Sequence, residues 1–265
     1  MRGLGRGQAR SSSSGRVRRV KPAILQWCMS SAAGDITSGP ATARGSAAVA
    51  AADAKAALAW LHGARFVASA ARLDQLPSDR LPEIAFVGRS NAGKSTAINT
   101  LAGQRRLAFA SRTPGRTQHL NLFALGPREA PEARLADLPG YGYAAVARDA
   151  KLRWQQVMAD YLRERETLAG VVLLVDARLG LTPLDVRLLE WIAPRVGSGR
   201  TRLLVLLTKA DKLNRIESRE SLARAEALLA AFATAEADIG VALFSASSRS
   251  GVDEVASTLR GWIAR

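Results

Sequence analysis

The sequence predicts an α/β fold in which a mostly parallel sheet is covered by helices on both faces. From Leu81 onward, short apolar runs alternate with helical patterns, as is typical of strands that are buried between crossover helices. The chain has 265 residues, of which 48% are apolar and 23% charged. A chain of this length and composition can bury a substantial core. We therefore expect an α/β domain.

The alternation places the individual elements. Strands are expected at Ile84–Val87, Leu120–Leu125, Val171–Val175, Leu203–Leu207 and Ile239–Phe244. Helices are expected at Ser95–Leu101, Ala150–Arg165, Pro183–Ala193, Ser218–Ala233 and Val252–Ile263. One connection, Gly126–Ala133, is rich in Gly, Pro and Glu and too short for a crossover helix. The strand before it and the short run Arg134–Ala136 after it should therefore form one antiparallel hairpin.

The first 62 residues differ in composition from the rest of the chain. Residues 1–60 hold nine basic and two acidic side chains, and Ser, Gly and Arg dominate the first 45 residues. Such a composition buries too little apolar surface to order itself. We expect residues 1–62 to form a disordered basic extension and 63–265 to form the domain, although the Ala-rich stretch Ala47–Leu61 is compatible with a helix. The alternatives for this extension are a tail, a transit peptide, or a start-site artefact with a later start at Met29.

Charge and cysteine content limit the class of protein. Lys and Arg total 38 against 23 Asp and Glu, a net charge of +15, which favours polyanionic partners such as nucleic acid or anionic lipid. The single cysteine, Cys28, excludes an internal disulfide and fits a reducing, cytoplasmic compartment. The longest apolar runs fall short of the run of about 18 residues that spans a bilayer, so no membrane insertion is expected. Two histidines and one cysteine exclude a His/Cys metal cluster.

A phosphate-binding motif follows the first expected strand. Eight residues fill the pattern G-x-x-x-x-G-K-[ST] between a strand and a helix: Gly88, Arg89, Ser90, Asn91, Ala92, Gly93, Lys94 and Ser95. In this context successive backbone N–H groups and the positive end of the helix face the phosphates. Lys94 would contact the outer phosphates, and the Ser95 hydroxyl would ligate Mg²⁺. The motif alone does not distinguish ATP from GTP.

A second motif follows the hairpin. It consists of Asp137, Leu138, Pro139 and Gly140. An acidic residue here can reach the metal through water, and the Gly140 N–H can approach a terminal phosphate. The pattern is short, but its order and distance after the phosphate-binding motif support its assignment to the same site.

Two further segments are candidates for contacting the base of the bound nucleotide. Thr208, Lys209, Ala210 and Asp211 follow an expected strand at the edge where ligands bind such sheets. The Asp211 carboxylate can accept both the N1–H and the 2-amino group of guanine, a donor pair that adenine lacks, and the Lys209 stem would pack across the base. Backbone N–H groups of Phe244, Ser245 and Ala246 could meet the guanine O6. The sequence therefore favours guanine and opposes an ATPase or kinase.

A polar loop, Ser111–Gln118, lies between the phosphate-binding motif and the hairpin. Its Gly and Pro content predicts a mobile switch loop. A threonine here can complete Mg²⁺ coordination only when the γ-phosphate is present, and both Thr117 and Thr113 are candidates.

Together the segments GRSNAGKS, TPGRTQ, DLPGYGY and TKAD resemble the EngB (YihA/YsxC) family of bacterial ribosome-biogenesis GTP-binding proteins, among the TrmE-Era-EngA-YihA-Septin-like GTPases. The resemblance runs from about Arg65 to the C-terminus. It implies a Ras-like P-loop GTPase G domain, monomeric and cytoplasmic, that converts GTP to GDP and phosphate. It also implies a role in assembly of the large ribosomal subunit, through rRNA and ribosomal proteins, and in normal cell division and septation. Within the switch loop it assigns nucleotide contacts to Gly115, Arg116, Thr117, Gln118 and His119, and it favours Thr117 as the Mg²⁺ ligand.

The catalytic residues implied by the resemblance are Lys94, Thr117 and Gly140. Ras-type enzymes place a glutamine directly after this glycine to orient the attacking water, but here the position is Tyr141. We therefore expect slow intrinsic hydrolysis that is completed either by K⁺ bound near Asn91 or by a group from the ribosome. Alternatively, Asn91 only shapes its turn.

Candidate contacts to RNA phosphates are basic side chains near the switch loop and on the next helix: Arg112, Arg116, Lys151, Arg153, Arg163 and Arg165. The alternative is a set of solvated charges balanced by Glu164 and Glu166. Tyr141 and Tyr143 are candidates for stacking on bases. Two other functions stay open: an RNA-binding scaffold in which GTP is structural, and a septation regulator that acts through protein partners.

Overall fold

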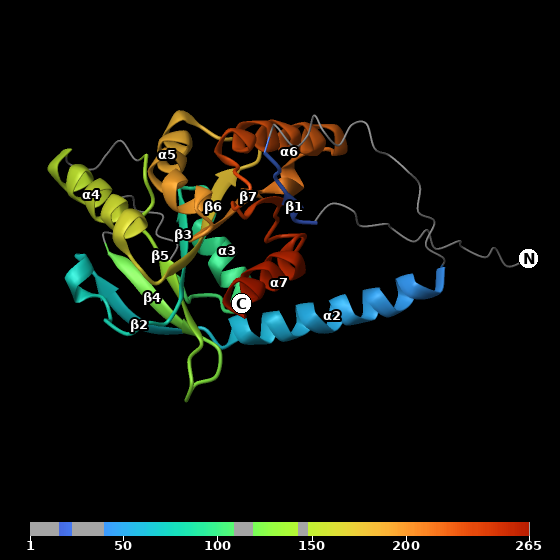
Figure 1. The fold of residues 1–265 in the computed structure, drawn as a ribbon, viewed down its shortest axis with the longest axis horizontal. Helices are drawn as coiled ribbons and strands as arrows, with labels where there is room; N and C mark the ends of the chain where they lie inside the picture. Colours follow the sequence, from blue (N-terminus) through green and yellow to red (C-terminus); the bar gives the residue numbers. More distant parts are fainter. Residues whose placement is uncertain (1–15, 23–39, 109–118, 143–147, 265) are drawn as a thin grey trace, which may run out of the picture.

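The computed structural model describes residues 16–22, 40–108, 119–142 and 148–264, with side chains at 40–48 and 148–154 excepted. The described part contains an α/β domain built on one eight-stranded sheet, shown in Figure 1. The strands are β1 (Arg18–Arg19), β2 (Arg65–Ala70), β3 (Glu83–Gly88), β4 (Leu120–Leu125), β5 (Ala133–Asp137), β6 (Leu168–Asp176), β7 (Arg202–Thr208) and β8 (Ile239–Leu243). The helices are α2 (Pro40–His62), α3 (Lys94–Leu101), α4 (Arg148–Glu164), α5 (Pro183–Gly197), α6 (Arg215–Leu229) and α7 (Val252–Ile263). The predicted α/β class is confirmed.

The strand order is β1-β8-β7-β6-β3-β5-β4-β2. The five central strands β8, β7, β6, β3 and β5 run parallel to one another. The predicted antiparallel hairpin is confirmed as the pair β4 and β5, in which Asn121 lies opposite Asp137. Two further antiparallel pairs, β2 with β4 and β1 with β8, form the two edges and were not predicted.

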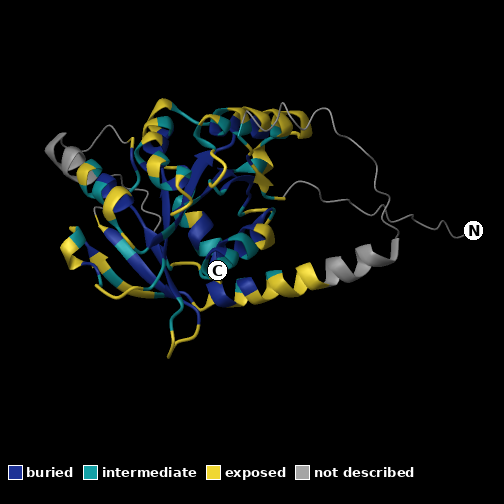
Figure 2. Cartoon of the chain, in the orientation of Figure 1, coloured by how far each residue is buried: buried dark blue, intermediate teal, exposed yellow. Residues whose placement is uncertain are grey.

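The central strands are buried on both faces, which explains their continuous apolar runs. Because side chains alternate across a strand, Val171, Leu173 and Val175 of β6 pack toward one face, whereas Val172 and Leu174 pack toward the other. Residues of α4, α5 and α6 complete the first core, and residues of α2, α3 and α7 complete the second. Figure 2 shows the buried strands between helices whose outer surfaces are exposed.

The N-terminal segment corrects one expectation. Residues 1–62 were expected to be disordered and outside the domain, but β1 pairs with β8 and Val20 is buried, its N–H donating to the Ile239 carbonyl at 2.9 Å. Trp60 and Leu61 of α2 are also buried, in the core that α7 completes. The open edge of β8 and the apolar face of α7 provide partners that composition alone does not reveal. Residues 1–15 and 23–39 lie outside the described residues.

The first turns of two helices explain where these begin. Thr182 precedes Pro183 at the start of α5, and its N–H and hydroxyl both bond to Asp185, at 2.7 and 2.6 Å. Asn214 caps α6 by accepting from the N–H groups of Ile216 and Glu217. This cap starts α6 three residues before the expected Ser218.

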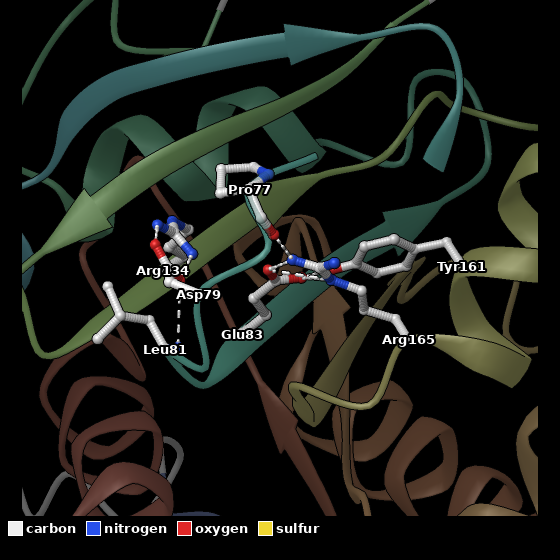
Figure 3. A network of polar contacts seen from close by, with 7 residues as sticks. All are labelled: Pro77, Asp79, Leu81, Glu83, Arg134, Tyr161 and Arg165. Atoms are coloured by element: carbon white, nitrogen blue, oxygen red, sulfur yellow. Dashed lines mark hydrogen bonds and ion pairs between the residues drawn. The ribbon is translucent and has the colours of Figure 1, made fainter. Parts of the chain in front are cut away.

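A buried polar network fixes the end of α4 against the start of β3 (Figure 3). Glu83 is fully buried, and its carboxylate accepts from the Tyr161 hydroxyl at 2.6 Å and from Arg165 Nη2 at 2.6 Å. Arg165 also donates to the Pro77 carbonyl at 2.8 Å, while Arg134 pairs with Asp79 nearby. Burial and the Glu83 carboxylate raise the pKa of the Tyr161 hydroxyl, so it stays protonated and donates. None of the described helices is long and apolar enough to cross a membrane.

Candidate functional site

Four of the predicted segments meet at one edge of the sheet. They follow β3, β5, β7 and β8, whose parallel arrangement brings their carboxyl ends together. Ligands of open α/β sheets bind at this edge. The structure therefore joins residues from Gly88 to Ala246, far apart in the chain, into one candidate site.

The phosphate-binding loop connects β3 to α3. Only glycine fits at its start, because a Cβ on Gly88 would lie 2.7 Å from the Leu174 carbonyl oxygen. Asn91 adopts a left-handed conformation with a φ of 66° and is exposed. α3 begins after Gly93, which has no side chain that could cap the first turn of the helix. Backbone N–H groups at a helix N-terminus bind anions.

Lys94 and Asp137 form an ion pair inside the site. Lys94 belongs to the first turn of α3, Asp137 ends β5, and both side chains are shielded from solvent. Ser95 follows Lys94 in the first turn of α3 and adds a hydroxyl group to this end of the helix. Cation, carboxylate and hydroxyl are the groups needed for a phosphate and its hard metal ion.

The turn Asp137–Gly140 is joined to the phosphate-binding loop by backbone hydrogen bonds of the following residue, Tyr141. The Ser90 N–H donates to the Tyr141 carbonyl at 2.9 Å, and the Tyr141 N–H donates to the Gly88 carbonyl at 3.3 Å. Gly140 lies so close that a Cβ would be 3.2 Å from Ser90 Oγ. The two predicted phosphate-side segments therefore form one continuous surface.

The Tyr141 side chain points away from this surface. Its hydroxyl donates to Asp185 Oδ1 at 2.5 Å, at the first turn of α5, and the residue is buried. Burial and the Asp185 carboxylate raise the pKa of the hydroxyl well above its usual value. Tyr141 therefore cannot take the place of a water-orienting glutamine, and the expectation that it stacks on RNA is wrong. Tyr143 lies outside the described residues.

Lys209 joins the segment after β7 to the phosphate-binding loop. Its backbone is left-handed, with a φ of 58°, and its Nζ donates to the Asn91 carbonyl at 2.8 Å and to Asp176 Oδ2 at 2.9 Å. The preceding Thr208 hydroxyl donates to the Ala92 carbonyl at 2.6 Å. These contacts hold the predicted base-reading segment beside the predicted phosphate site.

Asp211 and Ser245 meet although they belong to different strand ends. The Ser245 hydroxyl donates to Asp211 Oδ1 at 2.7 Å, and the Ala210 N–H donates to the Phe244 carbonyl at 3.2 Å. The Ser245 bond lowers the pKa of Asp211, so this exposed carboxylate is held ionised as an acceptor. Ala246 follows, partly buried.

Other predicted residues are described only in part. His119 is exposed just before β4, whereas Gly115, Arg116, Thr117, Gln118 and the rival Thr113 lie outside the described residues. Of the two proposed metal ligands, Ser95 is therefore described and Thr117 is not. Among the described residues, no three His, Cys, Asp or Glu side chains gather as a metal site.

The basic candidates for RNA contact behave differently from one another. Arg165 forms an ion pair with the buried Glu83 carboxylate, so its guanidinium is not available to contact an RNA phosphate. Arg163 is exposed, with its guanidinium carbon 5.7 Å from the Trp191 ring centroid. The side chains of Lys151 and Arg153, as well as Arg112 and Arg116, are not in the described part of the chain.

Sequence reasoning missed Asp176 and Asp185. Asp176 ends β6, is buried, and accepts from Arg178 at 2.9 and 2.6 Å as well as from Lys209. These partners, Arg178 foremost, hold the pKa of the carboxyl far below its usual value. Its position directly after the apolar run Val171–Val175 is a signal that could have identified it.

The fold and these segments define a P-loop GTPase G domain. A family model described as "50S ribosome-binding GTPase" matches residues 83–209. A protein from Acidovorax ebreus (strain TPSY), described as "Probable GTP-binding protein EngB", is 58% identical over 206 residues, covering 77% of this chain and 90% of the relative. A relative of the same description from Polaromonas sp. (strain JS666 / ATCC BAA-500) is 55% identical over 227 residues, covering 85% and 89%. The chain belongs to the EngB family of GTP-binding proteins.

Solved structures support the fold. A crystal structure of a probable GTP-binding protein engB matches with a TM-score of 0.50 and 18% identity, covering 69% of this chain and 98% of that one. Aquifex aeolicus Era bound to GDP·AlF4⁻ matches with a TM-score of 0.54 and 21% identity, covering 70% and 57%. At these identities the likeness concerns the Ras-like fold.

Proposed function

We propose that this chain is a GTP-dependent switch in assembly of the large ribosomal subunit, acting as a monomer in the cytoplasm. The observation that carries the proposal is the match of residues 83–209 to the 50S ribosome-binding GTPase model, over the segment that holds the phosphate-binding loop and Lys209. The net charge of +15 supports a partner rich in RNA. In this proposal the role in cell division and septation accompanies the ribosomal role.

The site residues divide the work of binding GTP and GDP. The loop Gly88–Ser95 cradles the phosphates, with Lys94 against the outer ones, and Asp211 with the Phe244–Ala246 backbone reads guanine. Ser95 and Thr117 would hold Mg²⁺, which when bound would neutralise charge on the phosphates. The pairing of Lys94 with Asp137 supports this assignment, because each group can exchange its present partner for a phosphate or for the hydrated metal.

Hydrolysis by the isolated protein is proposed to be slow. The buried bond of Tyr141 to Asp185 supports this, because no side chain directly after Gly140 is free to orient water. K⁺ near the exposed Asn91, or a group supplied by the ribosome, would complete the site. Function then follows from switching, in which the γ-phosphate holds Thr117 and Gly140 and hydrolysis releases them.

The experiment is cosedimentation of the full chain with large ribosomal subunits at fixed physiological salt, comparing GDP with a non-hydrolysable GTP analogue. Salt is fixed because charge alone binds rRNA. We expect retention in the GTP-like state and release in the GDP state. Equal retention in both states would instead indicate a scaffold in which GTP is structural. Absence of retention, with GTP-dependent capture of division proteins, would indicate a septation regulator.

A variant separates nucleotide switching from passive RNA affinity. Lys94→Ala removes the cation proposed to contact the outer phosphates without adding charge to the surface. It should abolish the difference between the two nucleotide states while basal RNA retention persists. Phosphate release measured with and without K⁺, and with and without subunits, identifies which of the two completes the site.

A further inference from the structure

Helices α4 and α5 lie side by side on one face of the sheet (Figure 1) and border a cavity of about 300 Å³, here called the α4–α5 groove. Its volume is at the lower end of the range for small-molecule sites. The residues that matter for its chemistry are Tyr141, Met158, Arg163, Arg187, Leu188 and Trp191. None of the residues predicted to contact the phosphates or the guanine of GTP lines it, so it is separate from the nucleotide site.

The wall of the groove combines an apolar base with two flat groups. Met158 and Leu188 are buried, whereas Trp191 is partly exposed. The Arg163 guanidinium lies over the Trp191 ring, 5.7 Å from its centroid. Aromatic rings and guanidinium planes are the groups on which unpaired RNA bases stack. A nucleobase therefore matches the shape and the apolar character of this wall.

The rim of the groove is cationic. Arg163 and Arg187 are exposed, and neither forms an ion pair with another described residue. No Asp or Glu is among the lining residues, and Gln155 adds an amide that can donate and accept at a base edge. An anion is therefore favoured at the rim, in keeping with the +15 charge of the chain.

We propose that the α4–α5 groove binds an unpaired nucleotide of single-stranded RNA, with the base against Trp191 and its phosphates on Arg163 and Arg187. An acidic peptide would satisfy the charges, but it would leave the flat Trp191–Arg163 wall without a matching planar group. The identification of this RNA as ribosomal rests on the proposed function. Tyr141 links the groove to the nucleotide site, because the same residue lines the groove and bonds to Gly88 and Ser90.

The test measures binding of fluorescent oligo(U), of oligo(A) and of the duplex they form to the full chain with GDP bound, by anisotropy at fixed salt. The groove variant is Arg163→Gln/Arg187→Gln, and the charge-matched control is Arg215→Gln/Arg219→Gln on α6, where both side chains are exposed. We expect the groove variant to weaken binding of single strands about tenfold and the control to weaken it about twofold. Trp191→Leu, which keeps an apolar side chain, should also weaken binding about tenfold. Crosslinks from a 4-thiouridine strand should map to α4 or α5.

Equal losses in both double variants would overturn the proposal, because binding would then follow charge alone. Binding of the duplex as tightly as single strands would also overturn the proposal. So would oligo-glutamate that binds through Arg163 and Arg187 without displacing RNA, because the RNA would then lie elsewhere. Cosedimentation of the same variants with large subunits separates this proposal from the ribosomal one. If the groove variants bind oligonucleotides as the wild type does and the chain still binds large subunits, only the ribosomal proposal stands. If the groove variants lose oligonucleotide binding but the chain does not bind large subunits, only the groove proposal stands.

Discussion

The Lys209 ammonium group bridges Asp176 and the Asn91 carbonyl, at 2.9 and 2.8 Å. Asp176 ends β6, Lys209 follows β7, and Asn91 belongs to the loop after β3, so one side chain connects three strand ends. Arg178 holds the other side of the Asp176 carboxylate. The Lys209 side chain thus positions the segment after β7 against the phosphate-binding loop, and it is held there by Asp176, which is expected to contact neither base nor phosphate.

Asp176→Asn should weaken GDP binding about tenfold, since a hydrogen bond to a charged group is worth about 1.5–3 kcal/mol. The loss should appear mainly as faster dissociation of a fluorescent GDP analogue, because Lys209 is no longer fixed. Asp74→Asn is the control, since Asp74 forms an exposed pair with Arg72 away from the site. An unchanged dissociation rate in Asp176→Asn would show that Lys209 is positioned by Asn91 alone.

Asp211→Asn should shift nucleotide preference from guanine toward xanthine. The carboxylate accepts from two donors of guanine, whereas an amide in its place can donate to the additional carbonyl of xanthine. The Ser245 hydroxyl, 2.7 Å from Asp211, should hold the new side chain in position. Competition of GDP and XDP against a labelled nucleotide measures the change. Retained selectivity for GDP would remove Asp211 from base reading.

The central strands and the order of the site segments could be predicted because each depends on local sequence. Apolar runs such as Leu203–Leu207 stand out, and the glycines of the phosphate-binding loop have fixed spacing. The edge strands β1 and β2 could not be predicted, because they are short or exposed and depend on an open partner edge. Asp176 and Asp185 were missed for a related reason, since their partners Lys209 and Tyr141 lie more than 30 positions away in the chain. Local sequence patterns therefore predict the central strands and the motifs, but not the contacts between residues far apart in the chain.

Glu83→Gln should lower the free energy of unfolding by about 3 kcal/mol, since it removes one partner of a buried ion pair. The Arg165 guanidinium would lose its counter-charge, and Tyr161 would lose its carboxylate acceptor (Figure 3). Glu220→Gln, which breaks the exposed pair with Arg224, should cost less than about 0.5 kcal/mol. Urea unfolding of the two variants provides the comparison, and equal midpoints would show that the network adds nothing to stability.

Tyr141→Phe should lower the free energy of unfolding by about 1–2 kcal/mol, because the buried Asp185 carboxylate loses one donor while Thr182 continues to bond it. GTP hydrolysis by the isolated chain should stay at the wild-type rate, because the tyrosine side chain faces α5 and not the phosphates.

The variant should also change the response to alkali. Because the pKa of Tyr141 is raised in the folded protein, the hydroxyl ionises first in the unfolded chain, so its contribution to stability is complete below the unfolded pKa near 10 and is lost as pH rises above it. Tyr141→Phe should therefore lose less stability than the wild type between neutral pH and the alkaline range, as measured by urea midpoints across pH. Tyr161→Phe is the matched variant for the other buried tyrosine, whose pKa is also raised. If Tyr141→Phe instead slowed hydrolysis strongly with the fold intact, the hydroxyl would act on the reaction, and the assignment of Tyr141 as a purely structural residue would be wrong.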